Sequence, residues 1–189
     1  MMTVEEIIKH LTGVPGWLNK EEDVPLFHKY AVALEPGETY LEVGTGFGYS
    51  AGVVALSTKE GVRIVTIDDG RHYYKKGTTK EKYEKRVRLL LDVKGVADRV
   101  EFICEDANEV AWEDPIQILF IDGDHDYENV LLDYEKWSPF VSKRGYMMFH
   151  DYRRGGVGGP RKVVHKVVLP EDRWIVAEVG GLTCVLQRR

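Results

Sequence analysis

The chain has 189 residues, of which 43% are hydrophobic and 30% are charged, as in ordinary globular proteins. This length favours one domain over 1–189, with an N-terminal helical cap (1–37) and an α/β core (38–189). The formal net charge of −5 argues against non-specific nucleic-acid binding, which needs a basic surface. No apolar run reaches the roughly 20 residues that span a bilayer, and Glu5 and Glu6 interrupt any signal-peptide pattern. We therefore expect a cytoplasmic protein without nucleic-acid or membrane partners.

Two amphipathic helices are expected before the first strand. Residues 3–6 form a capping box, and apolar residues follow at helical spacing. The second helix carries its apolar face over 27–34 and stops before a Pro-Gly pair. Trp17 and His28 are expected to be packing residues. The sequence leaves open whether these helices cover a pocket or one edge of a sheet.

A β-rich run that starts at Thr39 ends in the acid Glu42 and leads into an apolar helix over 51–56. The connecting loop has glycines at alternate positions, Gly44, Gly46 and Gly48. Such a loop lets the backbone approach a ligand, and the helix presents free N–H groups to it. The spacing is not that of a dinucleotide-binding loop, because Tyr49 occupies the third glycine position. Glycine-rich turns also serve plain strand-to-helix connections, so the loop alone does not identify a ligand.

The next predicted strand, over 62–68, ends in Asp68, where nucleotide-binding folds place a carboxylate for ribose hydroxyls. The alternative is a polar turn over 68–70. A basic and aromatic run follows. From Lys80 it is predicted to be an amphipathic helix that stops at Gly95, whereas 71–77 is left as a loop near the site.

The third strand, 100–107, also ends in acids, and Asp106 is an alternative helix N-cap. The fourth, 116–121, is a continuous apolar run, as expected for a strand covered on both faces. It opens into a short segment rich in acids, 122–127, and the following strand, 145–149, ends in His150 and Asp151. Acids gathered at one sheet edge repel one another, so a cation or a network of partners is expected there. Solvated strand-end acids are the alternative.

The C-terminal part begins with a loop over 152–160 that is rich in glycine and arginine. Its arginines either meet an anionic substrate or are solvated. A short helix should start at Pro160. Two strands, 174–179 and 182–187, flank Gly180-Gly181 and predict a hairpin.

Two motifs carry a family resemblance. The E-x-G-x-G-x-G run at 42–48 resembles the first motif of class I S-adenosylmethionine-dependent methyltransferases. Together with F-I-D-G-D-H-x-Y at 120–127 and His150-Asp151, it resembles the metal-dependent small-molecule O-methyltransferases of the catechol, caffeoyl-CoA and macrocin types, over about 39–152. The resemblance implies an α/β fold with a doubly wound, Rossmann-like sheet of seven strands in the order 3-2-1-4-5-7-6 and a C-terminal antiparallel hairpin. In that order Cys104 and Cys184 lie too far apart to form a disulfide.

The resemblance also implies roles for individual residues. It assigns cofactor binding, with S-adenosyl-L-methionine as the cofactor, to Glu42, Gly44, Gly46, Gly48, Ser50, Asp68, Asp106, Ala107 and Asp122. Asp106 would accept a hydrogen bond from the adenine amine while the Ala107 N–H donates to a ring nitrogen. A divalent metal cation falls on Asp122, His150 and Asp151, and the catalytic residues are His125, as general base, and Asp122. For His125 the alternative is a helix-start residue bonded to a neighbouring acid.

His150 departs from the family pattern, which usually has an oxygen ligand there. Either the metal is not magnesium, or His150 lies beside an oxygen-only site and has another role. The function implied is methyl transfer to a hydroxyl of a small molecule, with metal assistance. The alternatives are an NAD-dependent oxidoreductase and a non-catalytic cofactor-binding protein. The sequence does not identify the acceptor, the metal or the oligomeric state, and a homodimer is among the states it allows.

Overall fold

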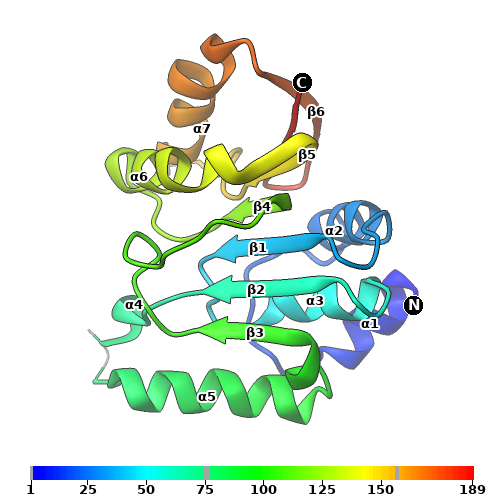
Figure 1. The fold of residues 1–189 in the computed structure, drawn as a ribbon. Coiled ribbons are helices and arrows are strands. Elements are labelled where there is room, and N and C mark those ends of the chain that lie inside the picture. The colour runs from blue at the N-terminus through cyan, green and yellow to red at the C-terminus, as the bar shows by residue number, and fades with distance from the viewer. Residues whose placement is uncertain (1, 75–76, 156–157) are drawn as a thin grey trace.

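A computed structural model of the chain describes residues 2–74, 77–155 and 158–189 (Figure 1). The predicted loops 71–77 and 152–160 each include two residues outside this set. The fold is α/β with one seven-stranded sheet in the order β3-β2-β1-β4-β5-β7-β6, which confirms the predicted fold class and strand order. The strands are β1 (Thr39–Val43), β2 (Arg63–Ile67), β3 (Val100–Ile103), β4 (Ile116–Ile121), β5 (Val141–Phe149), β6 (Trp174–Gly180) and β7 (Thr183–Arg188).

The first five strands are parallel and end at the same level. Val43 pairs with Ile67 on one side and with Ile121 on the other, and the register continues outward to β3 and β5. The chain therefore leaves all five strands along one edge, on the side where α4 lies in Figure 1. The predicted hairpin is confirmed, since β7 runs antiparallel to both β5 and β6. Ligands of open α/β sheets bind outside this carboxyl edge.

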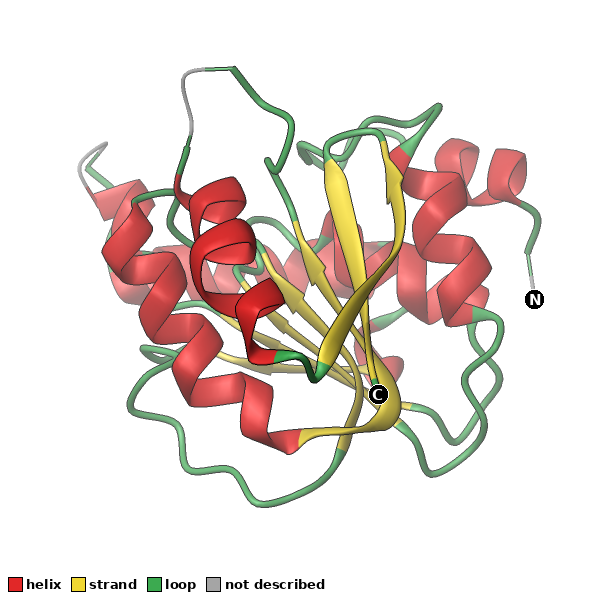
Figure 2. Cartoon of the chain, turned by 90° about the horizontal axis from the view of Figure 1, so that it is seen from above, coloured by secondary structure: helices red, strands yellow, loops and turns green. Residues whose placement is uncertain are grey.

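Helices cover both faces of the sheet (Figure 2). One apolar core packs α1 (Val4–His10), α2 (Asp23–Ala31), α3 (Tyr49–Ser57) and α5 (Lys80–Val93) against one face. A second core packs α6 (Tyr127–Trp137) and α7 (Gly159–Val163), which continues as a π-helical turn over Val164–Val168, against the other. The short α4 (Arg71–Tyr74) lies at the carboxyl edge. Single 3₁₀ turns cover Ala97–Arg99, Ser138–Phe140 and Leu169–Glu171.

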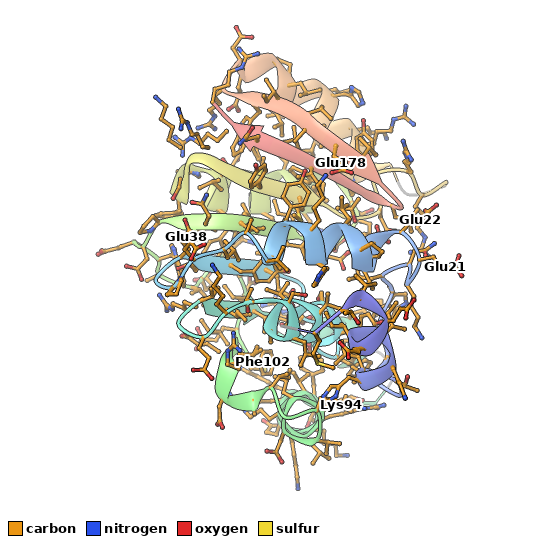
Figure 3. The ribbon with its side chains drawn as sticks, turned by 90° about the vertical axis from the view of Figure 1, so that its right-hand side faces the viewer. Glu21, Glu22, Glu38, Lys94, Phe102 and Glu178 are labelled. Carbon is orange, nitrogen blue, oxygen red and sulfur yellow. The ribbon has the colours of Figure 1, made fainter. Side chains whose placement is uncertain are left out.

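The N-terminal segment covers one sheet face and also reaches the carboxyl edge. The capping box of Thr3 and Glu6 is present at the start of α1. Helix α2 lies beside the C-terminal hairpin, where Lys29 forms an ion pair with Glu178 of β6 (Figure 3). Trp17, expected to be a packing residue, is 56% exposed, and its ring packs beside Gly46 of the loop after β1 and not in the apolar core. The link between α1 and α2 runs past the mouth of the cavity described below, and the indole lies there instead.

Cys104 and Cys184 are both buried and free, as the strand order predicted. In the described part of the chain no helix combines the length and the apolar character needed to cross a membrane.

Candidate active site

The glycine loop connects β1 with α3 through three left-handed residues. Gly44, Gly46 and Gly48 have φ values of +100°, +55° and +82°, which side chains disfavour. A Cβ on Gly44 would lie 2.2 Å from the backbone oxygen of Asp122. The loop after β1 therefore lies in direct backbone contact with the loop after β4, and glycine is required for that approach.

Glu42 supports this loop from inside the protein. Its carboxylate is fully buried and accepts hydrogen bonds from the Thr66 hydroxyl (2.6 Å) and the Tyr40 hydroxyl (2.8 Å). Burial raises the pKa of Glu42 to about 7, although these hydrogen bonds oppose the shift. Glu42 thus joins β1 to β2 beneath the loop.

Asp68 follows β2 and ties the loop to the next turn. Its carboxylate accepts hydrogen bonds from the backbone N–H of Gly46 (3.0 Å) and of Gly70 (2.7 Å). Burial raises the pKa of Asp68 above its ordinary value. The turn at 68–70 is polar, and Asp68 also lines the cavity. The interpretation of Asp68 as part of a polar turn therefore does not exclude its interpretation as a ligand of ribose hydroxyls.

Asp106, after β3, has both carboxylate oxygens engaged. One accepts a hydrogen bond from the Asn108 N–H at 3.0 Å, and the other lies 3.0 Å from the Arg71 guanidinium. Arg71 also pairs with Asp69, so it bridges the ends of β2 and β3. Asp106 acts as a turn-forming residue, close to the N-cap alternative, and its contact with an adenine amine stays a prediction.

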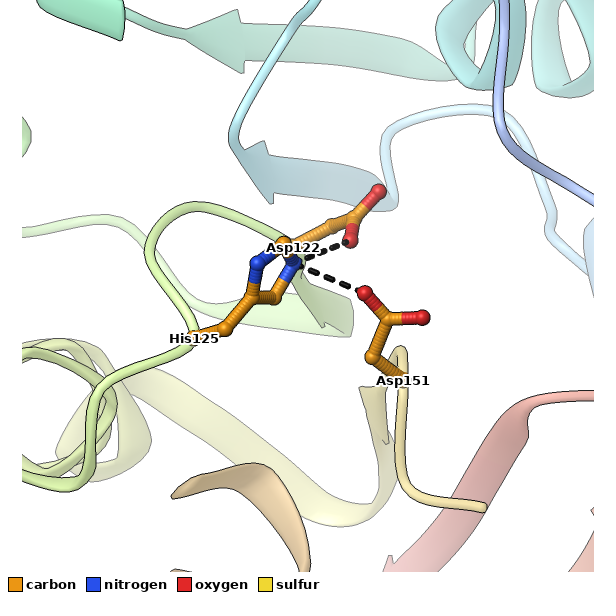
Figure 4. Close-up of side chains that lie close together, drawn as sticks. All are labelled: Asp122, His125 and Asp151. Atoms are coloured by element: carbon orange, nitrogen blue, oxygen red, sulfur yellow. Dashed lines mark ion pairs between the residues drawn. The ribbon is translucent and has the colours of Figure 1, made fainter. Parts of the chain in front are cut away.

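Asp122, His125 and Asp151 form the centre of the site (Figure 4). The Nε2 atom of His125 lies 2.8 Å from one oxygen of Asp151 and 4.0 Å from Asp122. The hydrogen bond with Asp151 raises the pKa of His125, although burial opposes the shift. Burial raises the pKa of Asp122. One ligand atom from each of the three residues lies within 4.8 Å of the others, which is the spacing of a metal site.

His150 lies below this group, almost completely buried. Its Nδ1 atom is 2.9 Å from Asp122 and its Nε2 atom is 3.7 Å from Asp23 of α2. Neither ring nitrogen makes a hydrogen bond of regular geometry. Burial alone would lower the pKa of His150, but Asp122 and Asp23 raise it to about 10. The two carboxylates therefore favour the protonated ring, which in turn favours the alternative in which His150 has a role other than metal binding.

Three residues of the site were not singled out from the sequence as site residues, although Arg154 belongs to the loop whose arginines were expected either to meet an anionic substrate or to be solvated. Asp133 lies on the buried side of α6, Arg154 contacts Asp151 at 3.3 Å, and Trp17 lies against the glycine loop. Asp133 shares a helical face with the apolar residues Val130 and Tyr134. An acid in an apolar stripe was a signal that the sequence offered. Arg154 and Trp17 offered no comparable pattern.

One cavity of about 700 Å³ collects most of the predicted residues. Its wall includes Gly44, Gly46, Ser50, Asp68, Asp106, Ala107, Asp122, His125, His150 and Asp151. Glu42 and Gly48 lie behind that wall, Glu42 beneath the loop and Gly48 at the N-cap of α3. Direct cofactor contacts by these two residues stay predictions.

A family model described as a methyltransferase domain matches residues 41–152. The chain is 50% identical over 38 residues to the uncharacterised protein R132 of Acanthamoeba polyphaga mimivirus, a match that covers 20% of this chain and 17% of the viral protein. Two solved structures have the same fold. The O-methyltransferase from Bacillus cereus in complex with SAH has a TM-score of 0.71 at 18% identity, covering 98% of this chain and 90% of that chain. The O-methyltransferase TomG from Streptomyces achromogenes, in complex with SAM, has a TM-score of 0.67 at 16% identity, covering 98% and 88%.

The matched segment begins within β1 and ends just after β5, so it contains the glycine loop and all three members of the Asp-His-Asp group. It spans more than half of the chain. The resemblance to class I methyltransferases drawn from the motifs is thereby confirmed, and the chain belongs to the methyltransferase-domain family.

Proposed function

We propose that this protein is an S-adenosylmethionine-dependent O-methyltransferase that acts on a hydroxyl group of a small molecule with the help of a divalent cation. One observation carries the proposal: the same cavity joins the glycine loop to Asp122, His125 and Asp151. The complexes of the Bacillus cereus enzyme with SAH and of TomG with SAM are consistent with such a cofactor.

The residues along the glycine loop suit the cofactor. Gly44 and Gly46 expose loop backbone to the cavity, and Ser50 offers a hydroxyl near the N-terminus of α3 for the methionine carboxylate. Asp68 offers carboxylate oxygens for two ribose hydroxyls. When bound, S-adenosylmethionine supplies a methyl group that its sulfonium charge has already activated. The protein then has to hold the acceptor oxygen in line with that group.

The donor set of Asp122, His125 and Asp151 also suits a divalent cation. It offers two carboxylates and one imidazole at metal-ligand spacing, a combination typical of manganese, iron or zinc more than of magnesium. A cation held there would lower the pKa of a bound hydroxyl. His150, cationic between Asp122 and Asp23, would position Asp122 for this task, so we assign the metal to His125 in preference to His150.

His125 is also the group best suited to accept the proton from the acceptor hydroxyl. Its Nε2 atom faces the cavity beside Asp122, and Asp151 holds the ring in position. Since the same nitrogen would bind the cation, His125 acts either as ligand or as base in any one step. Arg154 keeps a positive charge next to Asp151 and thereby favours the ionised carboxylate.

The acceptor we propose is a small hydroxylated molecule that enters past Trp17, with a cytoplasmic location for the enzyme. Isothermal calorimetry with S-adenosylhomocysteine, with and without Mn²⁺ or Mg²⁺, tests the cofactor and the metal. A methyl-transfer screen over phenols, catechols and sugars then tests the reaction. Saturable binding of NADH without binding of S-adenosylhomocysteine would contradict the proposal and favour an oxidoreductase.

A further inference from the structure

Asp133 is a buried acid that the proposed mechanism does not use. It lies on the inner face of α6, only 6% exposed, and its carboxyl group contributes to the cavity wall. The neighbouring loop makes room for it, because a Cβ on Gly123 would lie 3.3 Å from the Asp133 Oδ2 atom. Asp133 and Gly123 therefore line the same cavity as the glycine loop.

The charge of Asp133 lacks a cationic partner in the described part of the chain. Burial raises its pKa to about 7, the nearby acids Asp106 and Asp124 add to the shift, and a hydrogen bond from the Asn108 side chain opposes it. A buried carboxylate with so few donors is costly to keep ionised. A ligand that brings an N–H donor would relieve that cost, so the group is suited to a polar ligand.

Asp133, Asp106 and Asp124 are acids of the cavity wall near β3 and α6, and the Asp124 carboxylate is already bonded to the backbone N–H groups of His125 and Asp126 and to the Asn129 side chain. The Asp106 carboxylate is already bonded to the Asn108 backbone and paired with Arg71, and it is partly exposed. The Asp133 carboxylate is the most buried and the least satisfied of the three. Ala107 and Asn108 lie between Asp106 and Asp133 and line the same wall.

We infer that Asp133, in place of Asp106, accepts the hydrogen bond from the exocyclic amine of the bound adenine and thereby selects an adenine-containing cofactor. The inference rests on the proposed function, because the nucleoside end of the cofactor has to lie beside Asp68 and Ala107. Asp106 is the more exposed of the two acids and Asp133 the more buried, so a base bound there would meet Asp133 on its buried side. Hydrogen bonds discriminate most where water is excluded, which favours the buried carboxyl.

The test uses a base whose amine is replaced by an oxygen. S-inosylhomocysteine carries a carbonyl where S-adenosylhomocysteine carries the amine, so it would put an acceptor against an acceptor. Asp133 accepts hydrogen bonds with both oxygens only when it is ionised, so the comparison is made at about pH 8.5, above its pKa of about 7. There we expect the unmodified protein to bind S-adenosylhomocysteine about 10- to 100-fold more tightly in calorimetry. Asp133→Asn offers an amide that can donate a hydrogen bond to the inosine carbonyl. In this variant the dissociation constants of the two ligands should differ by no more than about 3-fold. Asp106→Asn is the matched control. It should weaken the binding of both ligands slightly and equally, so the ratio of their dissociation constants should stay as in the unmodified protein.

The outcomes separate the inference from the proposed function. If the unmodified protein binds neither ligand, the proposed function fails and the inference with it. If it binds S-adenosylhomocysteine and Asp106→Asn, but not Asp133→Asn, removes the preference, only the inference is overturned. Should Asp133→Asn not fold, the variant at the partly exposed Asp106, Asp106→Asn, alone decides: loss of preference there overturns the inference, and retention supports it.

Discussion

The two sides of the cavity are built on different principles. On the side of β1 and β2, backbone conformation and hydrogen bonds without a cationic partner hold the glycine loop, from Gly46 to Asp68 and from Tyr40 and Thr66 to the buried Glu42. On the side of β4 and β5, charged groups hold one another: His125 against Asp151, and His150 between Asp122 and Asp23. The first side is suited to cradle a ligand closely, and the second to move a proton or hold a cation. This division matches the two tasks of a methyl-transfer enzyme, which are to bind the methyl donor and to activate the acceptor.

The largest effect is expected on the charged side. His125→Gln should lower the rate of methyl transfer about 10²- to 10⁴-fold, because the reaction loses its proton acceptor or cation ligand. S-adenosylhomocysteine affinity should stay nearly unchanged, since the loop side is untouched. Single-turnover kinetics and calorimetry measure the two quantities. Asp126→Asn, an exposed neighbour at the start of α6, is the control and should retain activity. Equal activity in both variants would remove His125 from the mechanism.

On the glycine side, Gly44→Ala should cost about 3 kcal/mol or more of unfolding free energy, and cofactor affinity should fall as well. The new methyl group would collide with the Asp122 backbone, in addition to the strain of a positive φ. Gly13→Ala isolates the strain, since Gly13 has φ +91° and open space around it. That control should cost about 1 kcal/mol. Urea unfolding measures both, and equal losses would show that the contact between the two loops contributes little.

The sequence predicted the first side better than the second. Hydrophobic runs, the glycines at 44–48 and the acids after the strands fix where the chain turns, and parallel strands bring those turns to one edge. The partners of His150 could not be predicted, because Asp23 lies in a helix 127 positions away and also accepts hydrogen bonds from Leu182 and Thr183. The ion pair between Asp106 and Arg71 could not be predicted either, because Arg71 belongs to a segment that the sequence left as a loop. Local patterns identify turns, whereas long-range charge pairs depend on the finished fold.

The long-range pair between Asp23 and His150 can be tested against a more exposed pair that also starts from α2. Asp23→Asn should cost about 3 kcal/mol of unfolding free energy, because it leaves His150 with one carboxylate fewer in a buried site. Glu178→Gln breaks the partly exposed pair with Lys29, which joins α2 to β6, and should cost less than about 1 kcal/mol. Chemical unfolding of both variants gives the comparison. Similar losses would mean that the buried pair contributes no more to the unfolding free energy than the exposed pair does.

The stability of the fold should depend on pH through the buried carboxyl of Glu42. In the folded protein this carboxyl keeps its proton until about pH 7, whereas an ordinary glutamate releases it near pH 4.5. Between these values the folded state binds more protons, so the stabilising contribution is complete below pH 4.5 and is lost as the pH rises through 7. The total change is at most about 3 kcal/mol.

Glu42→Gln cannot titrate, so its unfolding free energy should fall less steeply between pH 5 and pH 8 than that of the unmodified protein. Urea unfolding without cofactor at several pH values measures the two slopes. The groups that face Glu42 remain in both proteins, namely Tyr40, Thr66, Ser50 and Asp122, so the difference between the slopes isolates one carboxyl. Glu60→Gln removes an exposed carboxylate and serves as the control. Parallel slopes for Glu42→Gln and the unmodified protein would mean that Glu42 is ionised in the fold, and the glycine side would then be held by charge, like the side of β4 and β5.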